Sequence, residues 1–196
     1  MNLKLNFRVY QKDIKDTIHN DWFEEFMFKE NWLEIPFYFN NRGKTLRFDL
    51  ESKGEKESKK LIEDIFDELF AENSYIYIAN YKPISTIRIS KYFKAAKKKQ
   101  KIHFNTRDED YQNEKNFVEI FITSTKYFKK EKFIQDYLKD EGAGATAFIS
   151  AKKGVALNFY DARGFDFFST DSVFLKRIEN KYKDYLYDFS KDNIDE

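Results

Sequence analysis

One short segment of the sequence concentrates side chains that could do chemistry. In Tyr160-Asp161-Ala162-Arg163-Gly164-Phe165-Asp166, two carboxylates and one guanidinium surround a glycine. Carboxylate oxygens bind divalent cations, which can activate water for hydrolysis. The same residues also suit an Asp-led β-turn, with Gly164 in a left-handed conformation and Arg163 paired to a carboxylate. We favour this structural interpretation, and keep Asp161, Arg163, Gly164 and Asp166 as a candidate functional turn.

A second candidate is a run of basic residues. Six lysines and no acid lie between Lys91 and Lys101, with Tyr92, Phe93 and Phe104 nearby. Lysines neutralise phosphates and aromatic rings stack on bases, so residues 97–101 are a candidate nucleic-acid site. Against this, residues 108–110 are acidic and the whole chain has a net charge of only +1. A dedicated nucleic-acid binder normally has a stronger basic excess. We therefore expect a patch that binds a protein partner, made of Lys94, Lys97, Lys98, Lys99 and Lys101.

Other catalytic and cofactor sites find little support in the sequence. The chain has no cysteine, which excludes disulfides, thiol nucleophiles and cysteine-ligated metals. Its two histidines, His19 and His103, are far apart, and no Gly-x-Ser-x-Gly motif is present. The glycines of residues 141–146 lack the Lys-Ser/Thr of a phosphate-binding loop. We expect no catalytic residue, no metal and no cofactor.

The distribution of charges bears on location. Lys4, Arg8 and Lys12 interrupt the N-terminus, so it does not resemble a signal peptide. The longest uncharged run, residues 142–151, has ten residues, whereas a membrane span needs about 18. We expect a soluble cytoplasmic protein, and the bias towards Lys, Asn, Ile, Phe and Tyr is typical of an AT-rich bacterial genome.

Hydrophobic periodicity predicts the elements that position these residues. In the first half, alternation predicts a strand at 3–9, and helical spacing predicts helices at 11–29 and 55–70. On the second helix, Glu63, Asp64, Asp67 and Glu68 are expected to face outwards. A hairpin is expected to join residues 35–39 to 45–50, and a buried strand follows at 75–81.

The second half of the chain is predicted to contain more strands. Residues 84–93 fit either a short helix or a strand, 117–123 a strand, and 133–138 a helix. A hairpin joins 146–150 to 155–160, residues 165–169 extend it, and a last helix runs from Ser172 to about Phe189, capped by Thr170 or Asp171. Elements that arrive in pairs favour one α+β domain over residues 1–196. We predict a largely antiparallel mixed sheet of about 6–8 strands with roughly three to five helices packed on it.

Three segments carry a resemblance to a known family. Tyr160, Asp161, Arg163, Gly164 and Asp166 resemble the Tyr-Asp-Asp-Arg-Gly-x-Asp signature of a bacterial family, domain-of-unknown-function family 3885. Residues 46–50, Leu-Arg-Phe-Asp-Leu, are similar to its Leu-Arg-Phe-Glu-Leu strand. Residues 182–189 look like its closing Tyr-Asn-Asp-Trp-Ile-Leu-Asp-Tyr, with Tyr185 in place of the Trp.

The resemblance covers about residues 35–191, and the N-terminal strand and helix look additional to it. The family has no established catalytic residues. Small, variable bacterial domains of this kind often stand beside toxin genes and act as immunity proteins. The resemblance therefore implies a protein-binding function, and this implication is an association only.

These observations favour a binding protein over an enzyme. We expect a non-catalytic domain, most specifically an immunity protein that neutralises a cognate toxin. The lysines of residues 94–101 would suit an acidic partner, and the acidic face of helix 55–70 a basic nuclease. The alternatives are a metal-assisted hydrolase that uses Asp161, Arg163 and Asp166, and a nucleic-acid-binding protein that uses residues 97–101.

Overall fold

The computed structural model describes residues 43–70, 75–82, 88–103, 117–139, 146–150 and 153–189. These residues form one seven-stranded sheet with the strand order β1-β7-β6-β5-β2-β4-β3, in which every neighbouring pair is antiparallel. The strands are β1 (Thr45–Asp49), β2 (Tyr75–Lys82), β3 (Lys97–His103), β4 (Phe117–Ser124), β5 (Thr146–Ser150), β6 (Val155–Asp161) and β7 (Gly164–Ser169). The helices are α4 (Glu55–Leu69), α5 (Ile89–Tyr92), α6 (Lys130–Leu138) and α7 (Ser172–Lys181), with 3-10 turns η2 (Thr125–Tyr127) and η4 (Lys183–Tyr185). The predicted α+β class is confirmed.

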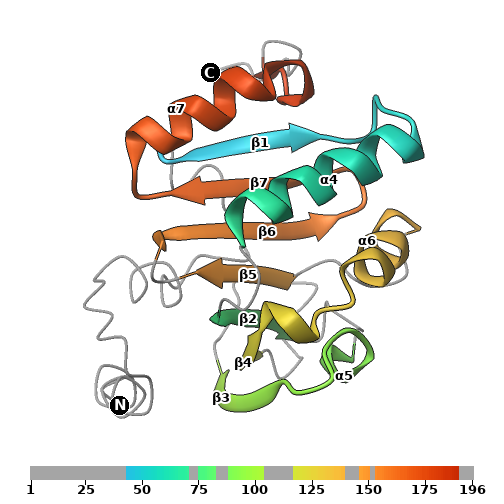
Figure 1. Ribbon diagram of the computed structural model, residues 1–196, viewed down its shortest axis with the longest axis vertical. Helices are drawn as coiled ribbons and strands as arrows, with labels where there is room; N and C mark the ends of the chain where they lie inside the picture. Colours follow the sequence, from blue (N-terminus) through green and yellow to red (C-terminus); the bar gives the residue numbers. More distant parts are fainter. Residues whose placement is uncertain are drawn as a thin grey trace.

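The helices pack against one face of the sheet, as Figure 1 shows. The predicted stripe on α4 is buried there, because Ile62, Ile65 and Leu69 have no exposed surface. The opposite face of this helix was predicted to face the solvent, but it is not wholly exposed. The Glu68 carboxylate, 16% exposed, accepts hydrogen bonds from Arg177 and Lys181 of α7 at 3.0 and 2.6 Å. This cluster joins α7 to α4.

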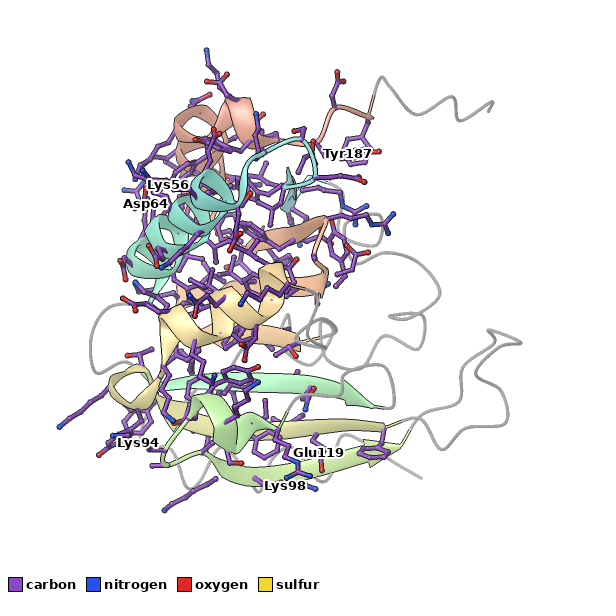
Figure 2. The ribbon with its side chains drawn as sticks, turned by 90° about the vertical axis from the view of Figure 1, so that its right-hand side faces the viewer. Lys56, Asp64, Lys94, Lys98, Glu119 and Tyr187 are labelled. Atoms are coloured by element: carbon purple, nitrogen blue, oxygen red, sulfur yellow. The ribbon has the colours of Figure 1, made fainter. Side chains whose placement is uncertain are left out.

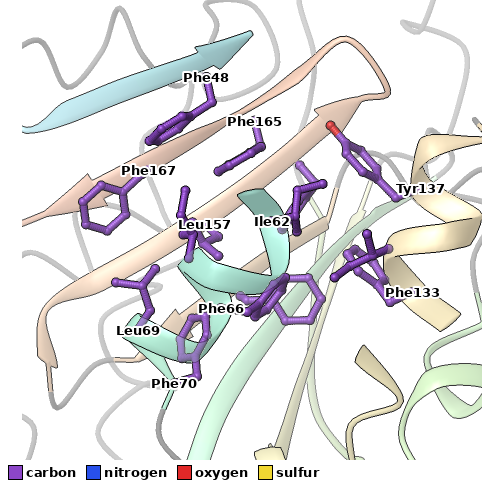
Figure 3. Packing of buried hydrophobic residues seen from close by; sticks show 14 of the residues in the cluster. Phe48, Ile62, Phe66, Leu69, Phe70, Phe133, Tyr137, Leu157, Phe165 and Phe167 are labelled. Carbon is purple, nitrogen blue, oxygen red and sulfur yellow. The ribbon is translucent and has the colours of Figure 1, made fainter. Parts of the chain in front are cut away.

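Aromatic side chains fill the space between the helices and the sheet (Figure 3). The Phe66 ring of α4 stacks on Phe159 of β6, with ring centroids 5.8 Å apart. On the same sheet face, the Phe48 ring of β1 stacks on Phe165 of β7 at 4.8 Å. Large rings fill the core with few side chains, which explains the aromatic excess of the sequence.

Strand β1 pairs with β7, a partner that the sequence did not predict. Residues 45–49 pair with β7, in the register Arg47 opposite Asp166 and Phe48 opposite Phe165. The other half of the expected hairpin, residues 35–39, lies outside the described residues, as do the predicted strand 3–9 and helix 11–29. The pairing with β7 brings the two ends of the described chain together.

The last helix is shorter than the predicted range, which extended to about residue 189. Helix α7 ends at Lys181, capped at its start by the Asp171 side chain, and η4 follows it. The chain then runs beside β1, where Leu186 forms a bridge with Phe48 and the Tyr187 amide donates to the Arg47 carbonyl at 2.9 Å. The prediction of helix there was wrong because an edge strand offers unpaired backbone groups that a neighbouring segment satisfies.

Residues 89–92 form a single helical turn, which agrees with one of the two alternatives predicted for residues 84–93. Residues 97–103, for which no element was predicted, form the strand β3 at the other edge of the described sheet. In the described part of the chain, no helix has the length and apolar character needed to cross a membrane.

Candidate functional site

The turn between β6 and β7 contains the candidate residues Asp161, Arg163 and Gly164. The backbone amide of Arg163 donates to Asp161 Oδ1 at 2.9 Å, and its Nε and Nη2 donate to Asp161 Oδ2 at 3.0 and 2.7 Å. Hydrogen bonding to Asp161 raises the pKa of the Arg163 guanidinium above its already high value. The negative charge of the Asp161 carboxylate is therefore compensated by Arg163 within the turn itself.

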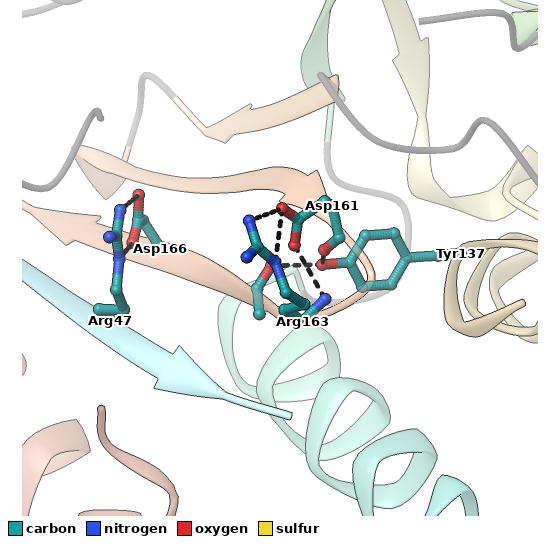
Figure 4. Close-up of polar contacts among 6 residues, drawn as sticks. Arg47, Tyr137, Asp161, Arg163 and Asp166 are labelled. Carbon is teal, nitrogen blue, oxygen red and sulfur yellow. Dashed lines mark hydrogen bonds and ion pairs between the residues drawn. The ribbon is translucent and has the colours of Figure 1, made fainter. Parts of the chain in front are cut away.

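Asp166 lies in β7 and has a different arginine partner. Its side chain has no exposed surface, and it accepts hydrogen bonds from Arg47 Nε at 2.8 Å and Arg47 Nη2 at 3.1 Å. Figure 4 shows this pair apart from the Asp161–Arg163 pair, so the two carboxylates do not converge on one point. A buried carboxylate with a bidentate arginine is satisfied electrostatically.

Gly164 is required by close packing rather than by its backbone angle. The described glycines with a left-handed backbone are Gly43 and Gly154, so the predicted conformation of Gly164 is wrong. A Cβ atom at residue 164 would collide with the Phe48 carbonyl oxygen and with the Tyr160 hydroxyl. The glycine thus lets β1 approach the turn.

Two tyrosines hold the turn against its neighbours. The buried hydroxyl of Tyr137, on α6, lies in hydrogen-bonding contact with the carbonyl oxygens of Asp161 and Gly164. Burial raises the pKa of Tyr160 far above its usual value, and the charge of Asp166 raises it further. The Arg47 guanidinium lies 5.0 Å from the Tyr160 ring centroid. Burial therefore favours the protonated, neutral form of Tyr160.

The candidate lysine patch lies at the β3 edge of the sheet. Lys94 and Lys97 are exposed, and among the described residues no carboxylate lies within ion-pair distance of either. Lys98 forms an ion pair with Glu119 of β4. The register between β3 and β4 shifts at Lys99, and both Lys99 and Lys101 belong to β3, but their side chains lie outside the described part.

This placement also gives the lysines a structural role that sequence reasoning missed. Lysine side chains and bulges on an edge strand hinder pairing with another chain. The sequence KKKQKIH shows no alternation, so nothing in its pattern predicts a strand.

The described residues contain no group of three or more His, Cys, Asp or Glu side chains that could hold a metal ion. His19 and the glycine-rich residues 141–145 lie outside them, and so does the His103 side chain. Arg47 and Tyr137, which sequence reasoning did not select, complete the environment of the turn.

A protein-family model described as "Domain of unknown function (DUF3885)" matches residues 20–190 of the chain. The chain belongs to the DUF3885 family. The match begins earlier than the motifs indicated, so part of the N-terminal segment that looked additional is within the family's range. No curated protein and no solved structure matches the chain.

The residues that carried the resemblance to DUF3885 now have physical roles in this chain. Asp161, Arg163 and Gly164 build the turn, Tyr160 lies under Arg47, and Asp166 pairs with Arg47. Residues 46–50 contribute this arginine, and residues 182–189 lie beside it. The three motifs therefore meet in one part of the fold.

Proposed function

We propose that this protein is a non-catalytic binding domain that contacts an acidic protein partner through the basic surface formed by Lys94 and Lys97. In its most specific form the proposal is an immunity protein that neutralises a cognate toxin in the cytoplasm. The observation that carries it is the exposure of these two lysines without a carboxylate partner in the described part of the chain. Unpaired charge at a surface steers association and selects partners of opposite sign.

The distribution of charge over the molecule supports this proposal. In Figure 2, Lys94 and Lys98 lie at the β3 end, whereas Lys56 and Asp64 lie on α4, further along the molecule. Lys98 is paired with Glu119, so among the described side chains of this patch the charge without a carboxylate partner belongs to Lys94 and Lys97. The near-neutral total charge of +1 therefore conceals a local basic surface.

The turn at residues 161–166 argues against the metal-assisted hydrolase. A divalent cation there would have to displace Arg163 from Asp161 and Arg47 from the buried Asp166. Both displacements break pairs of charge-assisted hydrogen bonds, which are among the stronger polar contacts in proteins. The metal-assisted hydrolase therefore ranks below the binding protein.

The test is co-expression of the tagged chain with the products of its neighbouring genes, followed by purification and mass spectrometry of what co-elutes. We expect one partner at equal stoichiometry that is toxic when expressed alone. Replacing Lys94→Glu and Lys97→Glu together is expected to weaken the complex at least about tenfold, and more at low salt.

The matched control reverses the same number of charges elsewhere, with Lys56→Glu and Lys183→Glu, both exposed and outside this surface. It should leave the affinity within about twofold. If the chain elutes alone from cells that express its neighbours, the binding proposal fails. Salt-sensitive retention on oligonucleotides that the Lys94/Lys97 variant loses would instead favour nucleic-acid binding.

A further inference from the structure

A pocket of about 440 Å³ lies where the end of α4 meets η2 and the start of α6. Phe66, Phe70 and Phe128 form its apolar floor, and Asp67, Thr125, Lys126 and Lys130 form its polar rim. None of these residues belongs to the turn or to the lysines discussed above. We call this feature the α4–α6 pocket.

The floor of the α4–α6 pocket is built into the core. The Phe128 ring stacks on Phe93 with centroids 4.5 Å apart and nearly parallel planes, and it contacts Phe66 at 5.3 Å. Phe66 and Phe70 are 2% and 7% exposed. Because the rings are fixed by their neighbours, the floor is a preorganised apolar surface, and ordering it on binding costs little entropy.

The rim of the pocket carries a net positive charge. Lys130 Nζ lies 2.5 Å from Asp67 Oδ1, so these two charges compensate each other. Lys126 is exposed, and no carboxylate of the described residues lies within ion-pair distance of it. The uncompensated charge at the rim is therefore a cation.

The rim is continuous with the basic surface at β3. The backbone amide of Lys94 donates to the carbonyl of Tyr127, the neighbour of Lys126, at 3.4 Å, and Phe93 forms a bridge with Phe128. Tyr127 is itself 40% exposed. An apolar pocket thus adjoins two lysines and an exposed aromatic ring.

We propose that the α4–α6 pocket receives one large apolar side chain from an acidic segment of a protein partner. This inference rests on the proposed binding function and names the chemistry of the segment that is bound. Aromatic or aliphatic anchors inserted into preformed pockets contribute most of the affinity of many interfaces. Carboxylates beside that anchor would pair with Lys126 and Lys94, which selects an acidic segment over a basic one.

The experiment titrates the full-length, ¹⁵N-labelled chain with three synthetic peptides and follows its amide signals by NMR. The peptides are Asp-Glu-Phe-Asp-Glu, the same peptide with Ala in place of Phe, and Lys-Lys-Phe-Lys-Lys. We expect the first to shift the amides of Thr125, Lys126 and Phe128. The alanine peptide should bind about tenfold or more weakly, because burial of a Phe side chain is lost. The lysine peptide should not bind at this site.

Variants of the protein separate the two parts of the pocket. Lys126 lies on the surface, and Lys126→Glu should weaken binding of the phenylalanine peptide about five- to tenfold. Lys183→Glu, on η4, should leave this binding unchanged. Phe70→Leu keeps an apolar side chain but removes one ring of the floor, and it should weaken the phenylalanine peptide more than the alanine peptide. Unchanged positions of the remaining amide signals establish that each variant is folded.

Two results would overturn the proposal. One is the absence of shifts at the pocket residues at millimolar concentrations of the phenylalanine peptide. The other is equal binding of the alanine or lysine peptide. Shifts confined to Lys94 and Lys97 would reject the pocket while leaving the proposed function intact. The co-purification experiment tests that function separately.

Discussion

Two arginines from different parts of the sequence determine the environment of the carboxylates around residues 161–166. Arg163 was predicted to pair with a carboxylate of the turn, and its partner is Asp161, two residues earlier in the sequence. Arg47 is 119 residues from Asp166, and only the pairing of β1 with β7 brings them together. At the residue scale, the local contact was therefore predictable and the distant one was not.

Asn80 is the residue whose environment is hardest to explain by packing alone. It is 1% exposed in β2, and in the described structure neither its amide nitrogen nor its amide oxygen has a hydrogen-bond partner. An unpaired buried polar group costs about 1–3 kcal/mol. Asn80→Val is therefore expected to raise the free energy of unfolding by about 1 kcal/mol, measured by urea denaturation.

Asn80→Ala serves as the comparison, because it removes the same amide but leaves a cavity beside the strand, and it should be less stable than the valine variant. A valine variant that is less stable than the wild type would contradict the prediction. It would mean that the amide is paired in solution.

At the scale of elements, a buried polar cluster ties the single turn α5 to α6. The Tyr92 hydroxyl donates to Asp136 Oδ2 at 2.8 Å, and Lys91 Nζ lies 2.7 Å from the same oxygen. Burial raises the pKa of Asp136, but the hydrogen bonds from Lys91 and Tyr92 and the charges of Lys91 and Lys132 outweigh it, so the pKa is lowered overall. A helix of four residues depends on such contacts, because its own hydrogen bonds are too few.

The lowered pKa of Asp136 predicts how this polar cluster responds to pH. The folded state favours the ionised carboxylate of Asp136. The contribution of this carboxylate to the free energy of unfolding is therefore complete above the ordinary aspartate pKa of about 3.9, and it is lost as the pH falls through the lower pKa of the folded state. Asp136→Asn should lower the free energy of unfolding by about 1–3 kcal/mol at pH 7. The difference from the wild type should shrink in denaturation experiments below about pH 4.

Lys132→Met is the control, because Lys132 Nζ lies 3.9 Å from Asp136 and is 46% exposed. Exposed pairs at this distance contribute at most about 1 kcal/mol. A difference between Asp136→Asn and the wild type that stays constant down to pH 3 would argue against an ionised Asp136.

The strand β3 marks the limit of sequence reasoning about elements. The buried stripe of α4 was predicted from its helical spacing, and β6 and β7 were predicted as part of a hairpin and its extension. Residues 97–103 are a strand because β4 offers a free edge, which no local pattern records. The same holds for residues 186 and 187, where contact with β1 replaces the helix that the spacing of apolar residues predicted.

At the scale of the whole molecule, the two edges of the described sheet are protected against association in different ways. The β1 edge contacts the chain's own residues 186–187, whereas the β3 edge carries lysines and a bulge. Covering and charging are both ways to hinder edge-to-edge association. One backbone donor at the covered edge is the amide of Tyr187.

Tyr187→Pro removes this donor and should expose the β1 edge. We expect a loss of about 0.5–1.5 kcal/mol in the free energy of unfolding and increased self-association in light scattering. Tyr187→Ala keeps the amide while removing the ring, so the comparison isolates the backbone contact. Equal behaviour of the two variants would show that the side chain, rather than the amide, protects the edge.

The sequence alone determined the class of the fold, the helix α4, the hairpins of β5, β6 and β7, and the pairing of Arg163 with a carboxylate of its own turn. Each of these depends on neighbours within a few residues or on the period with which one face is buried. The tertiary structure alone decided the Arg47–Asp166 pair, the edge strand β3, the end of α7 and the α4–α6 pocket. These depend on segments that are distant in sequence and meet only when the sheet is assembled, so no local pattern could contain them.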